Sequence, residues 1–333
     1  MIVVNYHDDL NEVQGDPVLG RLLGEEARAP FDRLSWWRNL RDTCGMIPLI
    51  AVACDGDARA VLPLTREGRA LKALANWYSF RVAQLVTPGA DAPRLLEALA
   101  RDLAGEAPRI TLASLADDAA ALAQAFGAAG WTVFLDQCDV NHALAVGGRS
   151  FAEYLAARPG PLRTTLKRKA GKVTVALHDA FDPAAWAAYE AVYAQSWKPA
   201  EGSPAFLRRF AEEEGAAGRL RLGLAFSDGA PVAAQCWTVE GGTAFIHKLA
   251  HTEAAKPLSP GTTLSAALFA RVIDRDRVEW IDFGTGDDPY KRDWMEVVRP
   301  RYRLEAFRPG WPGNWPAIAK RKLRGLVRGG RRG

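Results

Sequence analysis

Residues 220–250, LRLGLAFSDGAPVAAQCWTVEGGTAFIHKLA, decide the fold of this chain. The stretch holds three apolar runs, 220–226, 231–239 and 243–250, separated by Asp228-Gly229 and Gly241-Gly242. Asp-Gly between such runs indicates a hairpin, because a type I′ turn requires positive φ and these residues adopt it readily. The stretch therefore predicts a three-stranded antiparallel meander.

The first half of the chain repeats this order about 173 residues earlier. Runs 47–54 and 58–64 flank Asp55-Gly56, and Gly68 precedes a third run that begins at Ala70. Two common hairpins could align by chance. The equal spacing of the paired glycines, 56 to 68 and 229 to 241, favours a true repeat.

The likeness continues beyond the meanders. In each half a Pro-Gly pair leads into a helical pattern, 92–103 or 262–273, and then into a strand pattern, 109–115 or 278–283. The second helical pattern carries an apolar stripe made of Leu264, Ala267, Leu268 and Val272, so it should pack on a sheet. Both halves therefore predict the order β-β-β-α-β.

The sequence predicts an α/β (α+β) fold with two tandem lobes, each a mixed, mostly antiparallel sheet flanked by helices. A length of 333 residues fits two domains of about 150 residues each. We place an N-terminal lobe at 1–145, a C-terminal lobe at 146–307 and a tail at 308–333.

Composition and charge limit the classes of protein to which this chain can belong. With 48% hydrophobic and 25% charged residues the chain reads as globular. It shows neither a secretory signal nor a stretch of about 18 apolar residues, which predicts a cytoplasmic protein. Its four cysteines form no CxxC pair, so we expect reduced thiols and no metal. Eight Lys or Arg residues and no acidic residue lie in 308–333, which leaves the body with 35 basic against 39 acidic residues and predicts no nucleic-acid partner.

The tail allows two interpretations. Its apolar residues fall roughly on one side of a helix, and cations share the segment; the residues concerned are Trp311, Trp315, Ile318, Leu323, Leu326 and Val327 with Lys320, Arg321, Arg324 and Arg328. Such a basic amphipathic segment is typical of an element that binds an anionic membrane surface, here the inner face. The alternative is a disordered, solubilising tail.

Over roughly residues 150 to 305 the sequence resembles the Gcn5-related N-acetyltransferases (GNAT), and within them the CelD/BcsL-like, FemAB-related subgroup. The likeness is carried by five motifs: Ser196-Trp197-Lys198, Pro231-Val232-Ala233-Ala234-Gln235, His247-Lys248-Leu249-Ala250-His251, Ser259-Pro260-Gly261-Thr262-Thr263-Leu264, and residues 282–291, DFGTGDDPYK. The resemblance implies tandem GNAT-like lobes, of which the first is degenerate, and acyl-CoA as co-substrate. One departure is that the Q/R-x-x-G-x-G/A pyrophosphate loop is replaced by Ser-Pro-Gly-Thr-Thr.

The start of the second helix is the candidate donor site. Backbone N–H groups at a helix start lack intrahelical partners and favour phosphate oxygens. We expect Gly261, Thr262, Thr263 and Leu264 to form this cradle, with Lys256 just upstream adding positive charge. The alternative is a plain turn with a helix cap.

The strand 243–250 and the segment that follows it supply the candidate catalytic groups. Strand alternation places His247 and His251 on one face, so both are candidates for the general base, with His251 first. Either histidine could instead be structural. Asp282 could orient a histidine or bind the acceptor amine, and Tyr290 could protonate the leaving thiolate.

Four further groups are candidates for binding. Lys291 could contact phosphate or an acceptor carboxylate, whereas Asp287, Trp197 and Lys198 are expected on the acceptor side. The Asp287-Asp288-Pro289 segment could instead be only a turn. A basic run, composed of Arg163, Lys167, Arg168, Lys169 and Lys172, is either a solvated helix face or an electrostatic guide for an anionic substrate.

The sequence thus predicts an acyl-CoA-dependent N-acyltransferase. The acceptor would be a sphingoid-type lipid amine, as in bacterial ceramide synthases, or an amino sugar of the envelope or an exopolysaccharide. Two alternatives stay open: a FemAB-like transferase that uses aminoacyl-tRNA, and an inactive scaffold of envelope-polymer synthesis.

Overall fold

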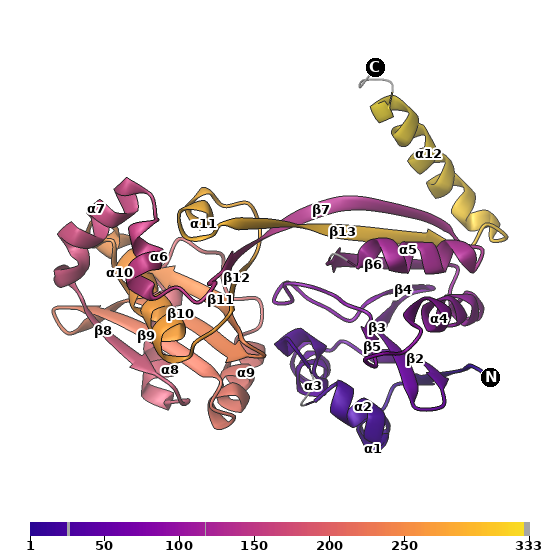
Figure 1. Cartoon of the computed structure of the whole chain (residues 1–333), viewed down its shortest axis with the longest axis horizontal. Helices are drawn as coiled ribbons and strands as arrows, with labels where there is room; N and C mark the ends of the chain where they lie inside the picture. The colour runs from indigo at the N-terminus through magenta and orange to yellow at the C-terminus, as the bar shows by residue number, and fades with distance from the viewer. Residues whose placement is uncertain (25–26, 117, 330–333) are drawn as a thin grey trace. The chain divides into compact units, whose positions relative to one another are not determined.

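The computed structural model describes residues 1–24, 27–116 and 118–329, and the chain divides into two compact units. Unit 1 contains residues 1–139 and 300–333, and unit 2 contains residues 140–299 (Figure 1). The chain therefore passes from one unit to the other inside two long strands, β7 (Thr132–Ala145) and β13 (Val297–Phe307). The expected lobes, 1–145 and 146–307, differ from these units mainly because the last strand returns to unit 1.

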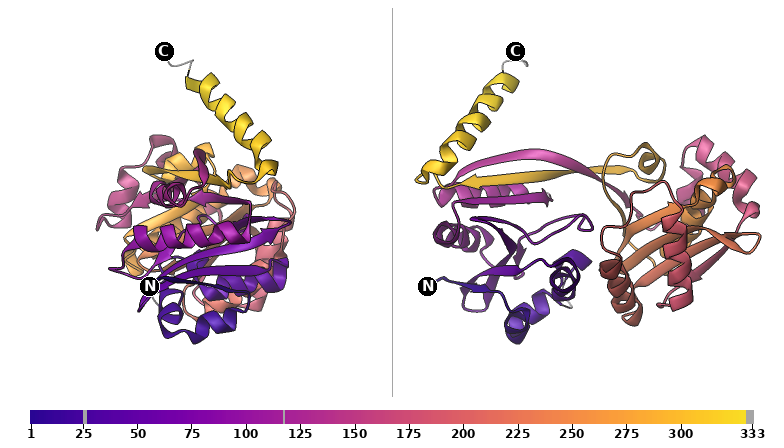
Figure 2. Two further views of the ribbon diagram at one scale, coloured as in Figure 1. Left: turned by 90° about the vertical axis from the view of Figure 1, so that its right-hand side faces the viewer. Right: turned by 180° about the vertical axis from the view of Figure 1, so that it is seen from behind.

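Unit 1 is a sheet with helices against it (Figure 2). Besides parts of β7 and β13 its strands are β1 (Val3–His7), β2 (Pro48–Asp55), β3 (Ala58–Glu67), β4 (Ala70–Ala73), β5 (Leu85–Val86) and β6 (Arg109–Leu115). Its helices are α1 (Leu10–Gly15), α2 (Pro17–Leu22), α3 (Leu34–Cys44), α4 (Ala92–Glu106), α5 (Ala119–Ala128) and α12 (Trp315–Gly329). Helix α4 packs on β2 and β3, and its leucines contribute to the core.

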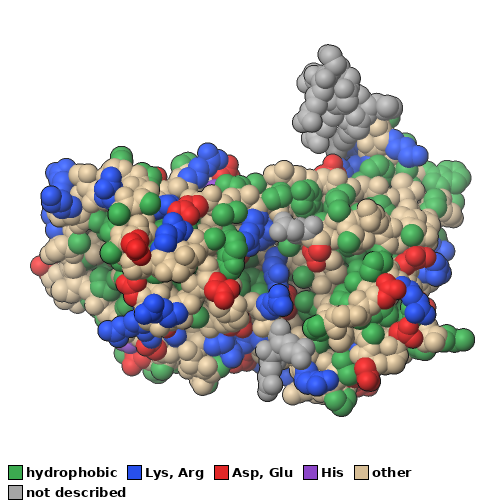
Figure 3. Space-filling view, viewed as in Figure 1, with side chains coloured by type: hydrophobic (Ala, Val, Ile, Leu, Met, Phe, Trp, Pro, Cys, Tyr) green, Lys and Arg blue, Asp and Glu red, His purple; other side chains and the backbone are tan. Residues whose placement is uncertain are grey.

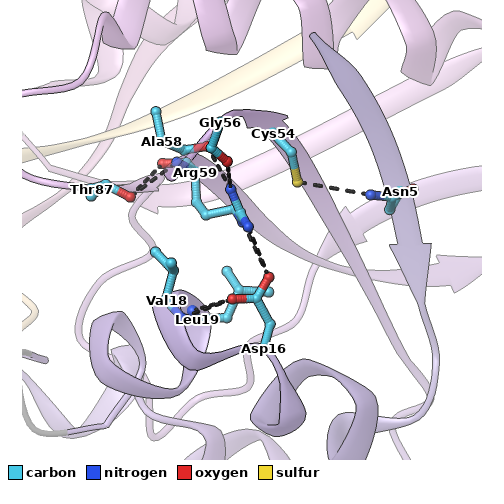
Figure 4. Close-up of polar contacts among 9 residues, drawn as sticks. All are labelled: Asn5, Asp16, Val18, Leu19, Cys54, Gly56, Ala58, Arg59 and Thr87. Carbon is cyan, nitrogen blue, oxygen red and sulfur yellow. Dashed lines mark hydrogen bonds and ion pairs between the residues drawn. The ribbon is translucent and has the colours of Figure 1, made fainter.

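A partly buried ion pair between Asp16 and Arg59 joins α2 to the β2–β3 hairpin (Figure 4). The Asp16 carboxylate caps α2 by accepting hydrogen bonds from the N–H groups of Val18 and Leu19, and it also binds the Arg59 guanidinium at 3.1 Å. Although partial burial alone would raise the pKa of Asp16, these three donors hold it below its ordinary value. The hairpin and the helix are thereby joined by one carboxylate.

Unit 2 contains the predicted meander. Its strands are β8 (Thr174–His178), β9 (Leu220–Ser227), β10 (Ala230–Glu240), β11 (Thr243–His251) and β12 (Trp280–Thr285), with the end of β7 beside β12. Its helices are α6 (Phe151–Ala156), α7 (Gly160–Lys169), α8 (Pro183–Ala194), α9 (Pro204–Ala216), α10 (Pro260–Ala270) and α11 (Pro289–Trp294). Asp228 and Gly229 have φ of 51° and 78°, as the predicted type I′ turn requires.

The predicted repeat is confirmed by the topology. In unit 1 the meander β2-β3-β4 is followed by α4, and β6 then pairs parallel to β4; in unit 2 the meander β9-β10-β11 is followed by α10, and β12 then pairs parallel to β11. Several elements that lie outside the repeated pattern were not predicted, among them β1, β7, β13 and the helices α1, α2, α3, α5, α6 and α9. The fold is a mixed α/β fold with a tandem repeat of the β-β-β-α-β unit.

The tail is largely helical rather than disordered. Helix α12 spans Trp315–Gly329, and its Arg321 pairs with Asp136 at 3.0 Å, which ties the helix to β7 within unit 1. Residues 330–333 of the predicted tail lie outside the described residues. None of the described helices is both long enough and apolar enough to cross a bilayer.

Candidate functional site

The centre of unit 2 is the place where β11 and β12 part. The two strands pair in parallel only from Thr243 to Phe245, although β11 continues to His251. A bulge lies just beyond this point, because Trp237 of β10 faces Ile246 while Cys236 faces Lys248. The extra residue of this bulge is His247, so strict alternation of side chains between the two faces breaks there.

Helix α10 begins close to the end of β11. Pro260 occupies its first position and has no N–H, which leaves the amides of Gly261 and Thr262 as the first-turn donors without intrahelical acceptors. Ser259 has a positive φ of 53° and its side chain does not cap the helix. A Cβ added at Gly261 would meet only the His251 ring carbon Cδ2, at 3.6 Å, so there is room for a small side chain beside Gly261.

Two polar side chains add to this helix start. The Lys169 ammonium at the end of α7 donates to the Ser259 hydroxyl at 3.1 Å. The Thr263 hydroxyl is buried and has no hydrogen-bond partner among the described residues. Lys256, by contrast, points into solvent. Positive charge gathers over α7, as Figure 3 shows, and Lys169 is the member of the predicted basic run that reaches α10.

His251 faces the start of α10. Its Nδ1 lies 3.0 Å from the Thr252 carbonyl oxygen, which can only accept a hydrogen bond, so Nδ1 carries the proton in the neutral ring. The lone pair is then on Nε2, which neighbours the carbon that faces Gly261. The Trp197 ring covers His251 with a centroid distance of 4.4 Å. The structure therefore brings three sequence-predicted residues together.

His247 occupies a different environment. Its Nε2 lies 2.8 Å from the Thr238 hydroxyl, and its ring meets Phe210 of α9 edge-on. Strand alternation would have kept it beside His251, but the bulge shifts the register between the two residues. The expectation that both rings face one cleft is wrong for this reason.

Asp282 is buried at the fork but does not contact a histidine. Its carboxylate accepts hydrogen bonds from the Asn141 amide at 3.1 Å and from the Gly284 N–H at 2.8 Å. Asn141 is fully buried, and its side-chain oxygen has no partner within the described part of the chain. Asp282 thus positions the glycine-containing loop after β12, and it does not orient His247 or His251.

The loop after β12 and the helix α11 that follows it hold three predicted residues, Asp287, Tyr290 and Lys291. Lys291 is buried, and its ammonium donates to the carbonyl oxygens of Thr285 and Gly286, so it braces the loop where a phosphate contact was expected. Asp287 is bound by Arg292 and by His142, which lower its pKa. Tyr290 packs edge-on against Phe283 and remains partly exposed; burial and the nearby Asp288 raise the pKa of Tyr290 to about 12, so it keeps its proton.

Lys198 lies beyond Trp197, on the α8 side of the sheet. Its ammonium is 5.7 Å from the Trp197 ring centroid and has no ion pair among the described residues. Burial, followed by the charge of Lys248, lowers the pKa of Lys198 to about 8, and charges at Asp288 and Lys291 also act on it. Lys198 therefore lies within electrostatic reach of the β12–α11 loop.

Residues 160–292, from the start of α7 to α11, match the family model described as "Acetyltransferase (GNAT) domain". The matched residues lie within unit 2. Among curated proteins, none matches the sequence.

Solved structures share the tandem architecture of this chain. FemX has a TM-score of 0.62 at 10% identity, with 90% of this chain and 96% of that chain covered. A tandem GNAT protein from the clavulanic acid biosynthesis pathway has a TM-score of 0.53 at 14% identity, covering 91% and 98%. L-PGS from Bacillus licheniformis has the same score and identity, covering 92% and 98%. At these identities the likeness shows the fold alone.

The sequence analysis did not single out two side chains of the candidate site, Asn141 and His142, and it gave Lys169 no role of its own. Asn141 and His142 lie in β7, whose polar pair inside the apolar stretch 140–146 was the available signal. Lys169 was noted only as part of a charged run, because its contact with Ser259 joins residues 90 positions apart.

Proposed function

We propose that this protein is an acyl-CoA-dependent N-acyltransferase whose site lies in the GNAT domain of unit 2. The observation that carries the proposal is the open start of α10, with the Lys169 ammonium on one side and the His251 ring on the other. A CoA thioester would supply the activated acyl group, and its phosphates fit the free amides of Gly261 and Thr262, the orphaned Thr263 hydroxyl and the Lys169 cation.

The corresponding helix of unit 1 does not offer this chemistry. Helix α4 also follows a meander, but its N-cap is Asp91, whose carboxylate accepts a hydrogen bond from the Arg94 N–H. A carboxylate at this position repels phosphate and satisfies a first-turn donor. This supports a degenerate first lobe and a donor site in unit 2.

His251 and Tyr290 are the candidates for proton transfer during the reaction. Attack by an amine requires its neutral form, and the Nε2 lone pair of His251 is the candidate acceptor of the proton that the amine loses. Tyr290 keeps its proton at neutral pH and is the candidate donor to a leaving thiolate.

The acceptor is proposed to be an amine of an envelope precursor, either a sphingoid-type lipid amine or an amino sugar. A lipid acceptor agrees with the helical tail, whose described side chains include the exposed Trp315 and Leu323. Contact of this tail with an anionic membrane surface is part of the proposal.

The donor site can be tested by calorimetry with CoA. Gly261→Ala adds a methyl group that reaches only ordinary contact distance from His251, so this variant should bind CoA as the wild type does. Gly261→Leu projects a branched side chain over the helix start and should abolish detectable binding. The proposal fails if the wild type shows no affinity for CoA or acyl-CoA, or if Gly261→Leu binds CoA normally.

A further inference from the structure

Unit 2 contains a pocket that the donor site does not use. It has a volume of about 450 Å³ and lies between α8, the segment 198–201 and the start of α9. This volume falls within the range of about 300–1,000 Å³ that is common for small-ligand sites. Its wall is mainly apolar and aromatic, with Trp186 stacked on Tyr189 at 4.6 Å and with Leu207 from α9.

The pocket lies on the face of the sheet opposite α10. Gln235 of β10 points to α10, because its amide donates to the Ser265 hydroxyl at 2.8 Å. The next residue, Cys236, pairs with Lys248, whose ammonium lies 5.3 Å from the Tyr193 ring centroid of α8. Successive strand residues point to opposite faces, so α8 and its pocket are separated by the sheet from the proposed phosphate cradle. The pocket is thus available to a molecule other than the CoA moiety.

Three charged side chains line the pocket, namely Glu190, Lys198 and Glu201, and they differ in whether an oppositely charged group lies beside them. Glu201 is neutralised by Lys248 at 3.0 Å. Glu190 accepts a hydrogen bond from the Trp186 indole N–H at 2.9 Å, and its side chain is otherwise in solvent. Lys198, which lines the same pocket, has no ion pair among the described residues. A partly buried ammonium that forms no ion pair with the described carboxylates would be stabilised by a ligand that supplies a negative charge.

Lys198 also connects the pocket to the reacting region. It follows Trp197 directly, and the Trp197 ring covers the candidate base His251. A molecule that filled the pocket and paired with Lys198 would therefore extend past Trp197 toward His251 at the end of β11.

We infer that this pocket binds the apolar part of the acceptor amine and that Lys198 pairs with a negatively charged group of the same molecule. The inference rests on the proposed function and makes it more specific: the acceptor is an anionic amphiphile that carries an amine. A sugar would leave its hydroxyl groups unsatisfied against the apolar wall, so the pocket favours the lipidic class of acceptor over the amino sugar.

The test uses the full-length chain and three probes with the same alkyl group: dodecanoate, dodecanol and dodecylamine. Binding is followed by calorimetry. The wild type should prefer dodecanoate to dodecanol by about tenfold or more, because a charge-assisted hydrogen bond forms only with the anion. Dodecyl phosphate in a fourth arm shows whether the anion site prefers carboxylate or phosphate.

Three variants locate the effect. Lys198→Met should remove the preference for dodecanoate and keep the affinity for dodecanol, whereas Lys172→Met, the same charge change at an exposed position, should leave both unchanged. Ala200→Trp, made at an exposed residue of the pocket edge, should weaken all probes. Equal wild-type affinity for the three probes, a preference for dodecylamine, or insensitivity to Ala200→Trp would overturn the inference.

Calorimetry with CoA separates this inference from the proposed function. Lys198→Met should bind CoA normally, because Lys198 is not part of the helix start. A wild type that ignores CoA but prefers dodecanoate through Lys198 would reject the proposed donor and leave the anionic pocket standing.

Discussion

The imidazole ring of His251 lies under the indole ring of Trp197, with the centroids 4.4 Å apart and the planes inclined by 40°. His251 ends strand β11, and Trp197 follows helix α8. The two residues lie 54 positions apart in the sequence. Together with the Thr252 carbonyl, Trp197 fixes how His251 presents its free nitrogen to the start of α10.

The neutral His251 ring should carry its proton on Nδ1. The Thr252 carbonyl has no hydrogen to donate, so the 3.0 Å contact requires an N–H at that position. Nitrogen-15 correlation spectra of the imidazole at a pH above its titration distinguish the two tautomers. A dominant Nε2–H form would remove the proposed base, because no lone pair would then face Gly261.

Lys169→Ala should weaken CoA binding by about tenfold or more, because it deletes a charge-assisted contact to phosphate. Lys167→Ala is the matched control, since Lys167 belongs to the same turn of α7 but points into solvent. Calorimetry at fixed ionic strength gives both constants. Equal losses in the two variants would mean that α7 acts only through its general charge, and no loss in either would remove Lys169 from the donor site.

Asp282→Ala should lower the free energy of unfolding by about 1–3 kcal/mol, because it leaves the buried Asn141 amide and the Gly284 N–H without an acceptor. Asp287→Ala, in the same loop but exposed to solvent, should lower the free energy of unfolding less than Asp282→Ala does. Urea denaturation compares the two. If Asp282→Ala were as stable as the wild type yet inactive, the carboxylate would have a chemical role instead of a positioning one.

The stability contribution of Lys198 should rise with pH between about 8 and 10.5. Its pKa is about 8 in the folded chain against an ordinary value of 10.5, so within this window the unfolded chain binds more protons than the folded one. Stability increases with pH wherever the unfolded state holds more protons. The facing charges are Lys248 and Lys291, which lower the pKa, and Asp288 and Glu201, which raise it.

The readout is the difference between the wild type and Lys198→Met in urea unfolding across this pH range. The wild type should gain stability relative to the variant as pH rises, because the variant has no ammonium to desolvate. A constant difference would show that the Lys198 ammonium is well solvated.

Much of unit 2 could be predicted because its signals are local. The Asp228-Gly229 turn, the strand alternation and the Pro-Gly helix start each depend on residues a few positions apart, and their repetition in the first half fixed the β-β-β-α-β order. The helix patterns 92–103 and 262–273 correspond to α4 and α10, with ends displaced by a few residues. Strand 109–115 corresponds to β6 without change.

The site itself depended on contacts that local patterns do not encode. A single extra residue in β11 turned His247 toward α9 and left His251 at α10, and alternation cannot reveal a bulge that depends on pairing with β10. The sequence predicted that Lys291 binds a ligand, but its ammonium donates hydrogen bonds to the carbonyl oxygens of Thr285 and Gly286, just before α11.

The sequence by itself determined the repeated meander, the helix that begins after Pro260 and the presence of ionisable groups near both, because backbone propensity and hydrophobic period act over short distances along the chain. Only the tertiary structure decided which of those groups meet: Lys169 with Ser259, Trp197 with His251, and Lys198 with an apolar pocket. The physical reason is that packing joins residues far apart in sequence, and its register depends on every strand between them.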